Sequence, residues 1–192
     1  MEKIAETLTN FLLESGEIAE EDYQIYKYGF TVMLEKGIFL ALCLGFAISL
    51  NKEIISILFF FIFIPLRSFA GGLHLDHYIT CLILSVLSYL FVLLMSNILI
   101  SPEVTILISV FALMCISLTY PVENINRKVD DKEKKVFEKK FCRCIIGNYF
   151  LVFLLFFLQK SLMLLTCAMT FLVITATMIL GKIKNKYKNI MV

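Results

Sequence analysis

One segment of the sequence places groups capable of covalent chemistry close together. It reads RSFAGGLHLDHYITC, from Arg67 to Cys81, and contains two adjacent glycines, two histidines, an aspartate and a cysteine. A cysteine near an imidazole is the minimum for a thiolate nucleophile, because histidine can deprotonate the thiol and later protonate a leaving amine. The residue types therefore favour acyl chemistry on sulfur.

The spacing of His74 and Cys81 sets a condition on the backbone. Seven residues of unbroken helix rise ~10.5 Å, which exceeds the ~3 Å of a hydrogen bond. We therefore predict that the chain from Gly71 to about His77 is not regular helix throughout. Gly71 and Gly72 suit such a break, since glycine adopts positive φ without steric cost. Cys81 is then expected in the first turn or two of a helix, where the macrodipole favours a thiolate and free amides could stabilise an oxyanion.

Other interpretations of the same residues stay open. Cys81 could be a small packing residue at the edge of a helix. Arg67 could be a snorkelling anchor or could bind a carboxylate. His74, His77 and Cys81 could ligate a metal, although a fourth ligand and an H-E-x-x-H pattern are lacking. Asp76 could orient an imidazole or be an exposed loop acid.

The composition indicates an integral membrane protein. Hydrophobic residues make up 59% of the chain and its mean hydropathy is +0.85, whereas ordinary soluble domains are about 45–50% apolar. The net charge of +2 is small, and the sequence shows no basic face that could follow phosphates. We therefore expect no nucleic-acid partner. The scattered cysteines do not form a disulfide framework; they are Cys43, Cys81, Cys115, Cys142, Cys144 and Cys167.

The apolar pattern predicts an all-α polytopic fold. Within an N-terminal region of residues 1–25, residues 1–14 form an amphipathic helix that lies along the membrane surface or packs on a partner subunit or a cytosolic loop. Six apolar segments follow, at 30–50, 53–66, 81–100, 104–121, 145–159 and 161–180. A crossing needs ~20 residues. The segments 53–66 and 145–159 are short, so each borrows flanking residues or is re-entrant.

Basic residues predict the orientation. Eight Lys or Arg residues lie in 122–144 and four more follow Gly181, so both regions are expected in the cytoplasm. The loop at 101–103 has no positive charge and is expected outside, so counting back through one crossing puts the segment 67–80 at the cytoplasmic face as well.

The pattern R-x3-G-G-x-H-x6-C, formed by Arg67, Gly71, Gly72, His74 and Cys81, resembles the signature of the accessory gene regulator B (AgrB) family. These are multi-pass cell-membrane cysteine endopeptidases that process quorum-sensing peptide precursors. Weaker likenesses are the acidic amphipathic start, the pair Tyr28-Gly29, and a Pro-Val pair at Pro121 followed by a lysine-rich loop.

The resemblance implies a single peptidase domain over residues 1–192, with Cys81 as nucleophile and His74 as its partner. Arg67, Gly71 and Gly72 would bind substrate or shape the site. It implies no metal and no cofactor, and gives His77 and Asp76 no catalytic role. The implied partners are the lipid bilayer, a second copy in a homodimer, and a short AgrD-like pro-peptide with an amphipathic leader and an acidic tail.

The implied reaction is acyl transfer: Cys81 displaces the tail, and a cysteine or serine of the peptide then closes a thiolactone or lactone. The basic loop 122–144, at net +3, could attract the acidic tail or could simply fix topology. The rival from another class is a small transporter or channel in which Arg67, His74 and Asp76 line a polar path. It predicts charges at midplane, of which the apolar segments are nearly free.

Overall fold

The computed structural model describes residues 2–73, 78–122 and 131–190 of the chain. In these ranges the chain forms helices and no strand, which confirms the predicted all-α fold. It divides into two compact units, Met1–Ser49 and Leu50–Val192, each described here by itself. Within these ranges six helices are long and apolar enough to cross a membrane, so the chain is a multi-pass membrane protein.

The N-terminal unit is a helical hairpin. It consists of α1 (Glu2–Glu14), the short 3₁₀ helix η1 (Glu20–Asp22) and α2 (Tyr23–Ser49). The small residues Ala5 and Thr9 of α1 are buried. Two polar contacts join α1 to α2: the Tyr23 hydroxyl donates to Asn10 Oδ1 at 2.7 Å, and Lys27 pairs with Glu6 at 3.4 Å. The amphipathic helix predicted for residues 1–14 is therefore present.

The apolar face of α1 is not the face that packs on α2. Ile4, Leu8 and Phe11 are exposed within the unit, although they form the stripe that the sequence predicts. An open groove of about 540 Å³ lies beside this stripe, lined by Phe11, Leu12, Ser15, Glu17, Ile18 and Tyr26. Contact of the stripe with the membrane surface stays a prediction.

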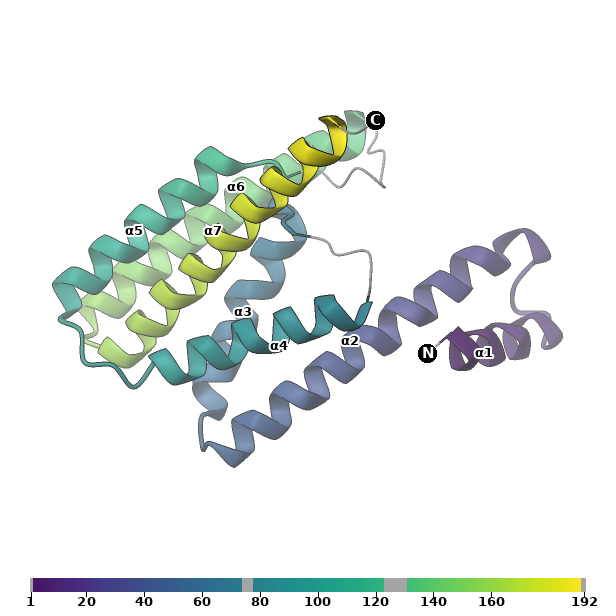
Figure 1. Cartoon of the computed structure of the whole chain (residues 1–192), viewed down its shortest axis with the longest axis horizontal. Helices are drawn as coiled ribbons and strands as arrows, with labels where there is room; N and C mark the ends of the chain where they lie inside the picture. Colours follow the sequence, from purple (N-terminus) through teal and green to yellow (C-terminus); the bar gives the residue numbers. More distant parts are fainter. Residues whose placement is uncertain (1, 74–77, 123–130, 191–192) are drawn as a thin grey trace. The chain divides into compact units, whose positions relative to one another are not determined.

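The second unit contains five helices (Figure 1), which are α3 (Glu53–Ala70), α4 (Tyr78–Met95), α5 (Pro102–Thr119), α6 (Asp131–Phe157) and α7 (Ser161–Ile190). The two segments predicted as short belong to longer helices, since α3 continues to Ala70 and α6 starts at Asp131. Lys and Glu are good helix formers, so α6 extends beyond its apolar part. Both α3 and α6 are long enough to cross a membrane.

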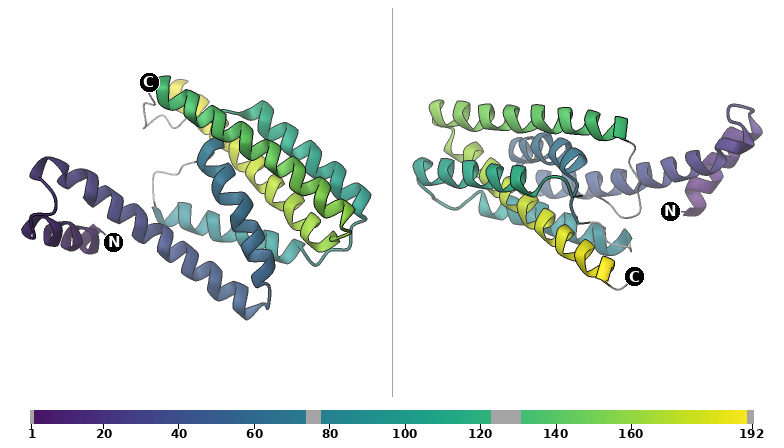
Figure 2. Two further views of the ribbon diagram at one scale, coloured as in Figure 1. Left: turned by 180° about the vertical axis from the view of Figure 1, so that it is seen from behind. Right: turned by 90° about the horizontal axis from the view of Figure 1, so that it is seen from above.

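Helix α7 is the centre of this unit. It contacts α3, α4, α5 and α6, and Figure 2 shows it crossing between them. Its apolar window is 67% buried, against at most 33% in the other candidate spans. The buried threonine hydroxyls bond to the carbonyl one turn earlier, as Thr170 does to Thr166 at 2.7 Å. Polar groups at the core of the bundle are thus satisfied locally.

Helices α3 and α4 are joined at the end where α3 begins. Lys52 caps α3, and its ammonium donates to the Leu93 carbonyl, to Ser96 Oγ at 2.9 Å and to Asn97 Oδ1 at 2.8 Å. Farther along, the hydroxyls of Ser56 and Tyr89 share a buried hydrogen bond of 2.6 Å. These contacts attach α4 to α3 at the end opposite to the Gly71–Gly72 pair.

Candidate active site

The predicted break in the helix lies at the glycine pair. Helix α3 ends at Ala70, Gly71 has φ 78° and Gly72 has φ 149°. Both values fall in the region that glycine adopts freely and that other residues avoid. Residues 71–73 are not helical, which confirms the predicted break for this part of the segment. Residues 74–77 lie outside the described part of the chain.

The first glycine contacts the chain that follows α5. Gly71 and Val122 form an isolated parallel bridge, and the Val122 N–H donates to the Ala70 carbonyl at 3.1 Å. A Cβ atom on Gly71 would collide with the Val122 carbonyl oxygen. This close approach, in addition to the positive φ, requires glycine at position 71.

Arg67, in the last turn of α3, holds the segment that follows its own helix. Its Nη1 donates to the Gly71 carbonyl at 2.8 Å and its Nη2 donates to the Leu73 carbonyl. A Cβ atom on Gly72 would overlap with the guanidinium. The planar fork of arginine suits two carbonyls at once. Of the two roles expected for Arg67, these contacts favour shaping the site over binding substrate.

Helix α7 holds the same segment from the other side. The Leu73 N–H donates to the Thr177 carbonyl at 3.0 Å. Gly181, one turn later on α7, lies against the Gly72–Leu73 peptide. Gly181 was not among the predicted site residues, and its only signal in the sequence is an isolated glycine late in a long apolar helix.

The thiol of Cys81 belongs to the fourth residue of α4 and is partly exposed. This confirms its predicted place in the first turn or two of a helix. None of the six cysteines, all of which lie in the described residues, forms a disulfide bond. The predicted residues His74, Asp76 and His77 lie outside the described residues, so the distance from imidazole to thiol and the metal alternative remain predictions.

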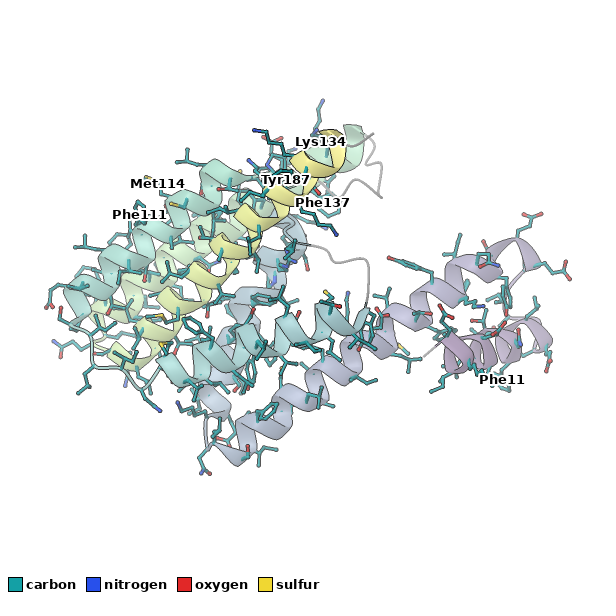
Figure 3. The ribbon with its side chains drawn as sticks, viewed as in Figure 1. Phe11, Phe111, Met114, Lys134, Phe137 and Tyr187 are labelled. Carbon is teal, nitrogen blue, oxygen red and sulfur yellow. The ribbon has the colours of Figure 1, made fainter. Side chains whose placement is uncertain are left out.

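Basic and aromatic side chains surround this end of the unit. Figure 3 shows Lys134 and Phe137 near the start of α6 and Tyr187 near the end of α7, at the same end of the bundle. The Lys140 ammonium lies 5.7 Å from the centre of the Phe69 ring, in the last turn of α3. Lys140 of α6 therefore lies near the end of α3, where the glycine segment begins.

An aromatic pair closes the turn after α5. The Tyr120 ring stacks on Phe141 with 3.9 Å between centroids, and the Tyr120–Pro121 peptide is cis. Burial raises the pKa of the Tyr120 hydroxyl, and Glu138 and Cys142 act in the same direction. The phenol is therefore neutral at physiological pH, and it packs as an aromatic surface.

Backbone contacts join parts of the three regions that were predicted to be cytoplasmic. These regions are 67–80, 122–144 and the chain that follows Gly181. Ala70–Gly71 contacts Val122, and Leu73 contacts α7 near Gly181. A single end for these regions is what the positive-inside pattern requires. Which side of the membrane this end faces stays a prediction.

Comparison with known proteins gives one match. The profile of the family Accessory gene regulator B (AgrB) matches residues 5–180, which is most of the chain. No curated protein and no solved structure matches it. The chain belongs to the AgrB family, whose members act in the processing of quorum-sensing peptides from AgrD-like pro-peptides.

Proposed function

We propose that the chain is a membrane cysteine endopeptidase that removes the C-terminal tail of an AgrD-like pro-peptide and promotes closure of its ring. One observation carries the proposal: Arg67 and α7 both hold the backbone that leads into His74, while the thiol of Cys81 is partly exposed in the first turn of α4. A thiol and an imidazole at this end of the bundle are the requirements of a cysteine peptidase.

In the first step, His74 takes the proton of the Cys81 thiol, and the sulfur attacks the carbonyl carbon that joins the signal segment to the tail. The C–N bond breaks, and the imidazolium returns its proton to the leaving amine. The products are an acyl-enzyme thioester and the free tail. The proposal assigns stabilisation of the oxyanion to amides at the start of α4, because the first turn of a helix has unpaired N–H groups.

In the second step, a cysteine thiol or serine hydroxyl of the bound peptide attacks the thioester. The new bond closes a thiolactone or lactone, and Cys81 leaves as a thiolate that regains its proton. Exchange of one thioester for another is nearly balanced in free energy, whereas hydrolysis is strongly downhill. Ring closure therefore needs an internal nucleophile held close and water kept out, conditions that a site at membrane depth favours.

The basic residues at this end of the bundle support an acidic tail as leaving group. Lys139, Lys140 and Arg143 belong to α6, and Lys182, Lys184 and Lys186 follow Gly181 on α7. A net positive surface raises the local concentration of an acidic peptide. The proposal includes a cytoplasmic location for this end and a homodimer as the working assembly.

The decisive test uses the full chain in lipid nanodiscs with a synthetic pro-peptide, followed by mass spectrometry of the tail and of Cys81. Cys81→Ala should abolish both tail release and the adduct, and His74→Ala should slow tail release by about 10²–10⁴-fold, the usual value of a general base. His77→Ala is the matched control and should retain the wild-type rate.

Two results would contradict the proposal. Tail release by Cys81→Ala would exclude a nucleophilic sulfur at this position. Equal losses in His74→Ala and His77→Ala, together with recovery on addition of zinc, would favour the metal-dependent alternative instead.

A further inference from the structure

We propose that Gly181 of α7 is a positioning residue for peptide cleavage, because the absence of a side chain lets α7 hold the Gly72–Leu73 backbone that leads into His74. The inference rests on the proposed function, in which His74 and Cys81 react.

The contact leaves no room for another side chain. A Cβ atom on Gly181 would lie 2.8 Å from the Gly72 carbonyl carbon, 2.9 Å from the Leu73 nitrogen and 3.0 Å from the Gly72 oxygen. All three atoms are backbone, so no flexible side chain could turn away. Any larger residue at position 181 must displace either the segment or α7.

The same face of α7 binds the segment directly. Thr177 precedes Gly181 by one turn, and residues four apart share a helix face. The Thr177 carbonyl accepts the Leu73 N–H at 3.0 Å. Gly181 provides the clearance and Thr177 provides the hydrogen bond, so the two act as one docking point for the segment.

Leu73 is the last described residue before His74, and it is held at both ends. Its N–H bonds to α7 and its carbonyl accepts a hydrogen bond from Arg67. That carbonyl belongs to the peptide bond with His74, so moving Leu73 moves the point from which the His74 backbone starts. A misplacement of about 1 Å in a reacting group can cost on the order of 10²-fold in rate.

The direct test compares two glycine-to-alanine variants of the full chain in nanodiscs. Gly181→Ala should lower kcat for tail release by about 100-fold, the cost of a misplaced reacting group, and leave KM within about twofold. Gly147→Ala is the matched control, because Gly147 lies in helix α6 and a Cβ there meets nothing within 4 Å. Its kinetics should equal those of the wild type.

A double-mutant cycle separates positioning from general damage to the fold. If Gly181 acts through His74, Gly181→Ala should have no further effect in a His74→Ala background. The pH profile of Cys81 alkylation in Gly181→Ala should also become that of His74→Ala. An equal fold-loss in both backgrounds, or a kcat equal to that of Gly147→Ala, would overturn the proposal.

A second variant replaces a backbone amide with an ester and adds no side-chain atom. It tests the same contact if Gly181→Ala does not fold. Leucic acid incorporated at position 73 replaces the N–H with an ester oxygen, which removes the donor to Thr177 and weakens the Gly72 carbonyl as an acceptor. We expect kcat to fall about 10-fold, the value of one hydrogen bond. The same replacement at Leu99, whose side chain is fully exposed beyond α4, is the control. An unchanged rate at position 73 would contradict the inference.

Failure of this inference differs from failure of the proposed function. If Cys81→Ala and His74→Ala both keep tail release, the proposed chemistry is wrong whatever Gly181 does. If both lose it while Gly181→Ala and the ester at 73 do not, the chemistry stands and only the role of α7 is wrong.

Discussion

The two ends of α3 use a cation in different ways. At the start of the helix, the Lys52 ammonium donates to Leu93, Ser96 and Asn97 at the end of α4. At its end, the Arg67 guanidinium donates to the carbonyls of Gly71 and Leu73. Burial lowers the pKa of Lys52, since the ammonium loses water.

The difference lies in what each cation holds. Lys52 joins two regular helices, and two of its three acceptors are the side chains of Ser96 and Asn97. Arg67 holds irregular backbone through two of its carbonyls, and this backbone leads into His74. A compact ammonium suits scattered acceptors, whereas a planar fork suits two carbonyls in fixed relation. We therefore expect Lys52 to contribute to stability and Arg67 to contribute to catalysis.

The largest effect is expected for Arg67→Lys. The charge remains, but one ammonium cannot hold both carbonyls in the geometry of the fork. Tail release should fall by about 100-fold through loss of positioning, measured by mass spectrometry under single-turnover conditions. A wild-type rate would mean that Arg67 acts only as a charge and would remove the contrast with Lys52.

The second prediction concerns Gly71→Ala. Its positive φ costs about 1–2 kcal/mol for a residue with a Cβ atom, and the new methyl group would collide with the Val122 carbonyl. We expect a lower thermal unfolding midpoint and tail release reduced by about 10-fold, as expected for roughly 1.4 kcal/mol of displaced geometry. Gly147→Ala, without such neighbours, should show neither change.

The third prediction is the converse case, Lys52→Met. It leaves the acceptors at the end of α4 without their donor, which should destabilise the fold by about 1–3 kcal/mol. Thermal unfolding in detergent should show a lower midpoint, while the rate of tail release by the folded fraction stays at the wild-type value. Strong loss of activity without loss of stability would contradict the division of roles between the two ends.

The smallest effect is expected from surface charge. Lys139→Gln removes an exposed charge at the end near Arg67, and Lys160→Gln removes one in the turn between α6 and α7. Only the first should raise KM for an acidic tail, by about 2–3-fold at low salt, and the increase should vanish near 1 M salt. Equal effects of both variants would show that the two ends do not differ in charge recognition.

Much of the fold follows from the sequence, because apolar length and helical periodicity are local properties. The helix at 1–14, the membrane helices and the break at Gly71 are all visible in this way. For 145–159 the sequence left open whether the segment borrows flanking residues or is re-entrant, and α6 confirms the first alternative, since charged Lys and Glu continue the helix before the apolar part. The apolar stripe of α1 was also predicted correctly, but the buried face of the helix is the one that contains the small residues Ala5 and Thr9.

The site could be predicted only in part. A motif identifies Arg67 and Cys81, because their types and spacing lie within one segment. It does not reveal that Arg67 donates to Leu73, or that Gly181 lies against Gly72, since these contacts depend on how α3 and α7 cross. Packing between distant segments carries no local sequence signal beyond an isolated glycine.

The bond between Leu73 and Thr177 also has a consequence for biosynthesis. Roughly 100 residues separate the two partners, and ribosomes add about 5–20 residues per second. A nascent chain therefore contains Cys81 for seconds before the α7 residue that accepts the Leu73 N–H has been translated. Under the proposed function, cleavage of the pro-peptide begins only near the end of synthesis, because the backbone before His74 has no docking point on α7 until then.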